Sequence, residues 1–225
     1  MNVNADLGEG AGADDAILGC VDSANIACSA HAGSISIAIA TAWLCRERGV
    51  EVGAHPSYED RAGFGRVERS LSAREIEALV AFQVGGLAAV APIAYVKPHG
   101  ALYHRCQEDG PTADAVVAVA ARHGVGVVCQ EGFELAQAAT RAGIPVYREG
   151  FADRLLLPDG SLAPRSRPDA VLHPEQAAAQ ALKLAHSGRF DTICVHGDTA
   201  GAAAVAAAVR QALDGAGIQT ASLRR

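Results

Sequence analysis

Residues 93–100 read Ile93-Ala94-Tyr95-Val96-Lys97-Pro98-His99-Gly100, a short β-prone run followed at once by ionisable and turn-forming residues. The run over 93–96 has the length and composition of a buried strand. Proline and glycine then fix a turn. Lys97 and His99 lie two residues apart, so they share a face if the extended geometry persists. This stretch predicts a buried strand with chemistry at its carboxyl end.

The same unit recurs along the chain, because short β-prone runs alternate with longer helical stretches. This alternation predicts repeated β-α units and a mainly parallel sheet. Strands are expected over 1–5, 24–28, 50–54, 93–96, 125–129, 145–148 and 192–195, and helices over 14–20, 34–48, 72–90, 112–123, 133–142, 174–187 and 200–216. Ser72 and Glu75 form a capping-box pattern, and Gly49, Gly124, Gly143 and Gly217 follow helical stretches. Spacing alone allows an open doubly wound sheet or a closed barrel.

Composition indicates one compact domain over residues 1–225. Half of the residues are hydrophobic and 20% are charged, which suits a single sizeable core. A net charge of −6, with no Lys/Arg run longer than two, argues against nucleic-acid binding. We expect no signal peptide, no membrane span and a cytoplasmic location.

The six cysteines lie far apart and form no C-x-x-C pair, which disfavours a zinc knuckle or a thioredoxin-type motif. Cys28, Cys129 and Cys194 stand among apolar strand residues. We expect these three to behave as small buried hydrophobes.

Ionisable residues follow six of the seven expected strands. They are Asp6, Glu9, His31, His55, Lys97, His99, Glu149, Asp153, Arg154, His196 and Asp198. In an α/β barrel the carboxyl ends of the strands converge on one mouth, so these groups should meet in space. The loops over 56–71 and 150–172 are long and charged, as expected of loops that cover a site.

Three of these residues raise the possibility of a metal. Asp6 lies in a glycine-flanked turn, and carboxylates there can hold water or a cation. His31 and His55 stand among small residues that leave their rings unobstructed. Together the three would suit a divalent metal with open positions, although no H-E-x-x-H spacing supports this, and the metal stays open.

The later strand ends suit acid, base and electrostatic roles. Lys97 could neutralise a phosphate or polarise a carbonyl, and His99 could move a proton. A carboxylate such as Asp198 near His196 could orient the imidazole. The sequence contains no G-x-S-x-G elbow. It also contains no phosphate-binding glycine loop, so any use of ATP would involve an unfamiliar site or a partner.

Eight ordered blocks carry a family resemblance. They are Asn4-Ala5-Asp6-Leu7-Gly8-Glu9-Gly10, Ser23-Ala24-Asn25-Ile26-Ala27-Cys28, His31-Ala32-Gly33, Gly53-Ala54-His55-Pro56, Gly63-Phe64-Gly65-Arg66, Val96-Lys97-Pro98-His99-Gly100-Ala101-Leu102-Tyr103, Phe151-Ala152-Asp153-Arg154 and Cys194-Val195-His196-Gly197-Asp198. The chain resembles the LamB/YcsF family, known as the A subunit of 5-oxoprolinase, over nearly its whole length. It departs from the family pattern near the expected mouth at Ser29, Ala30, Ser34 and His104.

The resemblance implies a seven-stranded (β/α) barrel of the glycoside hydrolase/deacetylase type. It also implies ATP-dependent opening of the lactam 5-oxo-L-proline (pyroglutamate) to L-glutamate, with partner subunits B and C. ATP would then be used through the complex, and a divalent metal is possible. Two alternatives remain open: a stand-alone metal-dependent deacetylase or amidase, and a substrate-binding subunit without catalytic activity.

The hypothesis assigns a role to each candidate residue. Asp6 or His55 would activate water, Lys97 and His99 would stabilise the oxyanion or phosphoryl oxygens, and Arg66 and Arg154 would hold the substrate carboxylate. The catalytic candidates are Asp6, His31, His55, Lys97, His99 and Asp198. The substrate-binding candidates are Asn4, Glu9, Asn25, Arg66, Tyr103, Asp153, Arg154 and His196.

Overall fold

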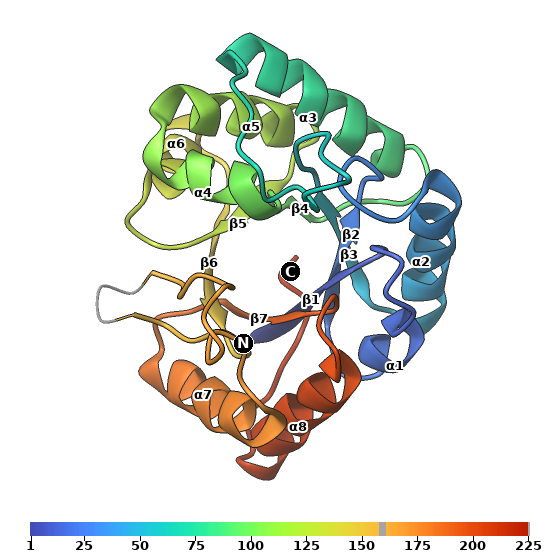
Figure 1. Cartoon of the computed structure of the whole chain (residues 1–225), viewed down its shortest axis with the longest axis vertical. Helices are drawn as coiled ribbons and strands as arrows, with labels where there is room; N and C mark the ends of the chain where they lie inside the picture. Colours follow the sequence, from blue (N-terminus) through green and yellow to red (C-terminus); the bar gives the residue numbers. More distant parts are fainter. Residues whose placement is uncertain (158–160, 225) are drawn as a thin grey trace.

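Seven parallel strands close into a barrel, and helices surround it (Figure 1). The computed structural model describes residues 1–157 and 161–224. The strands follow chain order around the barrel, and β7 pairs with β1. They are β1 Asn2–Leu7, β2 Ser23–Ala27, β3 Glu51–His55, β4 Tyr95–Val96, β5 Gly126–Cys129, β6 Val146–Phe151 and β7 Thr192–His196. The barrel is confirmed, and the open sheet is excluded by the β1–β7 pairing.

Eight helices are described outside the strands. They are α1 Asp14–Leu18, α2 Ile35–Arg48, α3 Ala73–Ala88, α4 Gly100–Glu108, α5 Gly110–Arg122, α6 Glu134–Ala142, α7 Pro174–Ser187 and α8 Ala202–Gly215. The capping box of Ser72 and Glu75 is confirmed at the start of α3. Gly49 and Gly143 close α2 and α6 in the left-handed conformation. Among the described helices, none is long and apolar enough to cross a membrane.

Strand β1 shows how the barrel separates apolar from polar side chains. Val3, Ala5 and Leu7 belong to the apolar core. Because side chains alternate along a strand, Asn2, Asn4 and Asp6 lie on the opposite face. Their side chains bond to polar groups of neighbouring strands: Asn2 to Ser23 and Thr192, and Asn4 to Thr192 and Asn25. This face of β1 therefore belongs to a hydrogen-bonded polar network inside the barrel.

Strand register places three polar residues side by side at the end of this network. Asp6 on β1 is paired with Asn25 on β2 and with His196 on β7. Parallel strands end at the same edge of the sheet, so residues that are distant in sequence meet at one mouth.

Several element boundaries differ from the sequence expectation, and β4 is shorter than expected, covering only Tyr95–Val96; three further differences bear on the site. Strand β1 continues two residues beyond Ala5, and β6 extends to Phe151, so Asp6 and Glu149 lie within strands. Helix α4 was not expected, because the Pro98-Gly100 signal indicated only a turn. Gly100 adopts φ +58°, and α4 then buries Leu102, Tyr103 and Cys106.

Candidate active site

A cavity of about 220 Å³ opens at the carboxyl ends of the strands. Its wall combines ionisable groups with a few apolar side chains. The lining residues are Asp6, His55, Arg66, Lys97, Pro98, His99, Gly100, Ala101, Tyr103, His104, Phe151, Arg154, Leu162, Ala163, Pro164, Arg165 and His196. The strand ends thus converge on one site, as expected for a barrel.

Lys97 lies between two buried carboxylates. Its Nζ atom is 2.9 Å from Asp6 Oδ1, 2.7 Å from Glu149 Oε1 and 3.0 Å from Cys194 Sγ. Burial lowers the pKa of Lys97, but Asp6, Cys194 and Glu149 outweigh it and hold that pKa well above its ordinary value. Lys97 is therefore an ammonium at neutral pH.

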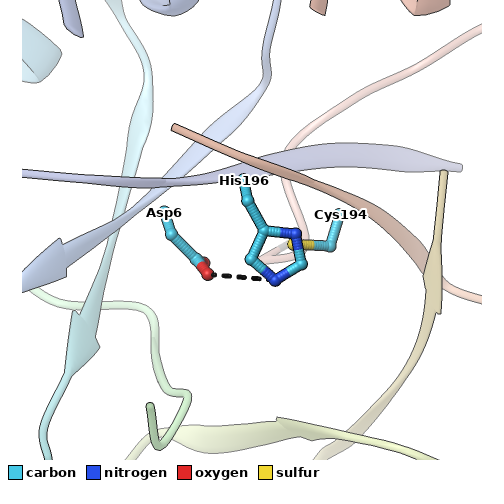
Figure 2. Close-up of side chains that lie close together, drawn as sticks. All are labelled: Asp6, Cys194 and His196. Atoms are coloured by element: carbon cyan, nitrogen blue, oxygen red, sulfur yellow. Dashed lines mark ion pairs between the residues drawn. The ribbon is translucent and has the colours of Figure 1, made fainter. Parts of the chain in front are cut away.

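The two oxygens of Asp6 have different environments. Oδ1 accepts hydrogen bonds from Asn25 Nδ2 at 2.7 Å and from Lys97. Oδ2 lies 3.4 Å from His55 Nε2 and 3.8 Å from His196 Nε2, and Figure 2 shows the His196 ring directed toward this carboxylate. Burial raises the pKa of Asp6, but the adjacent His55 and Lys97 hold it well below its ordinary value. Asp6 is therefore ionised.

Three imidazoles pack together beside Asp6. The rings of His31 and His99 stack with centroids 3.9 Å apart, and His99 Nδ1 lies 2.9 Å from His55 Nε2. Burial, then the neighbouring His55, lowers the pKa of His31 to about 3 and that of His99 well below its usual value. Both rings are neutral at pH 7.

Glu9 lies next to this cluster. Its Oε1 atom accepts from His31 Nε2 at 3.2 Å and lies 3.5 Å from His99 Nδ1. Burial, together with the negative charges of Asp6 and Asp198, holds the pKa of Glu9 well above its ordinary value.

His196 is oriented by Asp153. The Asp153 carboxylate accepts from the His196 backbone N–H at 2.8 Å and from Nδ1 at 3.0 Å. The ring therefore carries its hydrogen on Nδ1. The other nitrogen, Nε2, faces the cavity and Asp6 and is left as a proton acceptor.

Three arginines contribute to the cavity wall. Arg66 and Arg165 both bind Asp198, at 2.5 and 3.3 Å. Arg154 donates to the carbonyl oxygens of Ala163 and Ala170 at 2.7 and 3.2 Å. Guanidinium groups fixed in this way can bind an anionic group of a ligand.

In the part of the chain that the structure describes, three overlapping groups of side chains could hold a metal. Their donor atoms lie within 4.8 Å of one another in each of the sets Asp6–Cys194–His196, Asp6–His55–His99 and Glu9–His31–His99. The sequence suggested Asp6, His31 and His55 as a possible set of metal ligands. Among the described residues, the set that contains Asp6 and His55 has His99 as its third member instead of His31.

The sequence candidates divide into two layers around the cavity. Eight line it: Asp6, His55, Arg66, Lys97, His99, Tyr103, Arg154 and His196. Within the described chain the other six, Asn4, Glu9, Asn25, His31, Asp153 and Asp198, lie behind this wall and contact residues that form it. All fourteen are gathered in one region, and their individual roles stay predictions.

Sequence reasoning gave no role to several residues of the site. Cys194 was expected to be only a buried hydrophobe, but its sulfur contacts Lys97. Glu149 followed the strand-end pattern without a role, and it also accepts from Tyr103 Oη at 3.2 Å. Arg165 was unassigned within the long loop over 150–172. The alternation of Asn2, Asn4 and Asp6 with apolar residues along β1 is the sequence feature that could have predicted the polar network inside the barrel.

A closed β/α barrel with ionisable groups at the carboxyl ends of its strands has the architecture of a barrel enzyme. The chain belongs to the LamB/YcsF family, whose model matches residues 1–225. It is 41% identical over 242 residues to the A subunit of 5-oxoprolinase from Neisseria meningitidis serogroup C, and the match covers 99% of each chain. It is 45% identical over 243 residues to a protein of the same name from Chloroflexus aggregans, and that match covers 97% of this chain and 96% of the other.

Solved structures agree with this assignment. The lactam utilization protein from Thermus thermophilus superposes with a TM-score of 0.90 and 38% identity over 99% of both chains. A family 4 carbohydrate esterase from Streptomyces lividans has a TM-score of 0.58 and 10% identity over 99% of this chain and 92% of its own. The esterase shares the fold alone.

Proposed function

We propose that this chain is the component of an ATP-dependent 5-oxoprolinase that opens the lactam ring of 5-oxo-L-proline to give L-glutamate. The observation that carries the proposal is the Lys97 ammonium, held between Asp6 and Glu149 in the wall of a cavity of about 220 Å³. A fixed cation in a water-poor site stabilises an oxyanion that forms on a carbonyl. The names of the relatives, which refer to 5-oxoprolinase and to lactam utilization, support this substrate class.

The ring-opening step uses groups that already face the cavity. Water adds to the lactam carbonyl carbon while His196 Nε2 takes its proton, and Asp153 stabilises the imidazolium that forms. Lys97 binds the carbonyl oxygen as negative charge develops on it or, once that oxygen is phosphorylated, binds the phosphoryl oxygens. The C–N bond then breaks, and the departing nitrogen takes the proton back from His196. Arg66, Arg154 and Arg165 hold the substrate carboxylate.

ATP enters this scheme through other chains. A lactam amide is a poor electrophile, so transfer of the terminal phosphoryl group of ATP to its carbonyl oxygen, with release of ADP, would activate it for attack by water. Cleavage of the C–N bond would then leave the acyl phosphate of glutamate, and a second water would release phosphate and give L-glutamate. The sequence has no phosphate-binding glycine loop, so we assign ATP binding to partner subunits B and C. The six cysteines are all free thiols, which supports a reducing compartment such as the cytoplasm.

The experiment measures glutamate release from 5-oxoproline and ATP by this chain alone, by subunits B and C alone, and by the mixture. The proposal expects activity only in the mixture, and at least tenfold slower turnover with Lys97→Ala. An unchanged rate would remove Lys97 from the mechanism. Release of product from simple amides or acetyl esters by this chain alone would favour the stand-alone hydrolase. Tight 5-oxoproline binding with no effect of variants in the cavity on turnover would favour a binding subunit.

A further inference from the structure

Two histidine nitrogens, one on His55 and one on His99, lie 2.9 Å apart beside the cavity. His55 Nδ1 lies 2.7 Å from the Lys97 carbonyl oxygen, and His99 Nε2 lies 3.0 Å from that of Phe64. Carbonyl oxygens only accept, so each of these nitrogens carries the ring's hydrogen. The remaining nitrogens, His55 Nε2 and His99 Nδ1, are 2.9 Å apart. In neutral rings both present lone pairs, and neither can donate to the other.

Side-chain oxygens of Asp6 and Glu9 bring further lone pairs close to these two nitrogens. Asp6 Oδ2 lies 3.4 Å from His55 Nε2, and Glu9 Oε1 lies 3.5 Å from His99 Nδ1. Glu9 Oε2 and His31 Nδ1 are buried and have no hydrogen-bond partner among the described residues. Buried polar atoms are normally paired. A bound cation would pair these donor atoms on the side of Asp6 that Lys97, which bonds to the other carboxylate oxygen, does not reach.

The backbone is shaped to hold these rings. Phe64 adopts φ +55°, an uncommon conformation for a bulky residue, and its carbonyl meets His99. Asp6, His55 and His99 all line the cavity. Tetrahedral ligands about 2.05 Å from a zinc ion lie about 3.3 Å from one another, close to the separations of 2.9 and 3.4 Å seen here.

We propose that Asp6 Oδ2, His55 Nε2 and His99 Nδ1 bind one divalent transition-metal ion, with Glu9 and His31 orienting His99. Two imidazole nitrogens and one carboxylate oxygen suit Zn²⁺ and its neighbours such as Co²⁺ better than Mg²⁺ or Ca²⁺, which prefer oxygen ligands. Three protein ligands facing a cavity leave a position for water or substrate. A metal at this position would supply Lewis-acid chemistry. The proposal is independent of the substrate.

The rival set around Cys194 is less suitable for a cation. Figure 2 shows Asp6, His196 and Cys194, which can also gather donor atoms. The Lys97 ammonium, however, lies 3.0 Å from Cys194 Sγ and 2.9 Å from Asp6 Oδ1. A divalent ion there would be repelled by this charge. Glu9 and His31 form the third set with His99, but they lie behind the cavity wall.

The test is direct metal binding by the whole chain. Chelator-stripped protein is titrated with Zn²⁺ by calorimetry and with Co²⁺ by visible absorption, and the bound metal is counted after gel filtration. We expect one equivalent per chain and a rise in Tm on binding. His55→Gln and His99→Gln should each weaken binding at least about a hundredfold, and His31→Gln about tenfold, as for a residue that orients a ligand.

Two variants act as controls. His104→Gln removes an imidazole that lines the same cavity but belongs to none of the three sets, and Cys194→Ser removes the rival ligand. Both should keep the wild-type affinity. Thermal unfolding without metal shows whether each variant folds. Less than half an equivalent in the wild-type protein overturns the proposal whatever the variants do, as does binding that survives His99→Gln and disappears with Cys194→Ser.

Discussion

Lys97 Nζ lies 2.7 Å from Glu149 Oε1, and both side chains are buried. Glu149, on β6, also accepts hydrogen bonds from Tyr103 Oη and Asn4 Nδ2. Removing one partner of a buried pair leaves the other uncompensated. Glu149 is therefore as much a part of the site as the lysine that the sequence drew attention to.

We predict that Glu149→Gln lowers the free energy of unfolding by about 2 kcal/mol, the size of a buried hydrogen bond to a charged group. The amide keeps the shape but removes the charge, and turnover should fall about tenfold because Lys97 shifts toward Asp6. Urea unfolding and glutamate release by the reconstituted complex measure the two effects. Glu131→Gln is the control, because Glu131 is half-exposed and its contacts with Arg148 and Arg189 are 3.9 and 4.0 Å long. Equal losses in both variants would contradict the prediction.

Asp60 holds the loop that brings Arg66 to the cavity, and its contribution should depend on pH. Burial raises the pKa of Asp60, but hydrogen bonds from the Val67 and Gly63 N–H groups and the charge of Arg69 hold it below its ordinary value. A carboxyl with a lowered pKa stabilises the fold above the pKa of the unfolded state, and this stability is lost as pH falls through the folded pKa. Asp60→Asn should therefore destabilise the protein at pH 7, and the difference should shrink below about pH 4.

Urea unfolding of both proteins at pH 7, 5, 4 and 3 measures this effect. Glu59→Gln, which changes an exposed neighbouring carboxylate, should leave the pH dependence unaltered. A difference between wild type and Asp60→Asn that stays constant down to pH 3 would show that Asp60 does not act through its charge.

The sequence allowed the approximate positions of the strands, and the strand ends that carry ionisable groups, to be predicted because they depend on local patterns. Runs such as Ile93 to Val96 mark buried strands, and ionisable groups directly after them mark the carboxyl ends. Closure of the sheet was not accessible in this way, because the β1–β7 pairing joins segments about 190 residues apart. The family resemblance, rather than the spacing, favoured a barrel.

The arrangement within the site was less accessible from sequence. His31 and His55 both looked like ligands beside Asp6, but in the structure His99 stacks on His31 and contacts His55 through a ring nitrogen. Cys194 has the sequence context of an ordinary core cysteine, and only the fold places it against Lys97. Asp153 was expected to bind substrate, which stays a prediction, and nothing in the sequence indicated that its carboxylate binds His196. Such contacts depend on side-chain direction across strands, which residue order alone does not specify.

Gly65 should be irreplaceable because it packs directly against the histidine cluster. It adopts φ +67°, and a Cβ there would meet Ser57 Oγ and lie 2.9 Å from His31 Cβ and 3.0 Å from His99 Cδ2. Gly65→Ala should cost about 3 kcal/mol or more, the sum of left-handed strain and overpacking. Gly124→Ala has a similar φ of +65° with nothing within 4 Å, so it should cost only about 1 kcal/mol. Equal losses of unfolding free energy in the two variants would show that the loss comes from backbone strain alone and not from overpacking.

Arg165 should act on substrate affinity rather than on the chemical step. It lines the cavity, and Asp198 fixes its guanidinium group 3.3 Å away, while the reacting centre proposed here lies at Lys97 and His196. A group that holds the substrate carboxylate equally in the ground and transition states changes KM and leaves kcat nearly constant. Arg165→Gln should therefore raise KM for 5-oxoproline at least about fivefold, with kcat within about twofold.

Arg167→Gln is the matched control, because Arg167 is exposed on the same loop and pairs with Asp169. Steady-state kinetics of the reconstituted complex separate the two constants, and a fall in kcat at constant KM would place Arg165 at the reacting atoms instead.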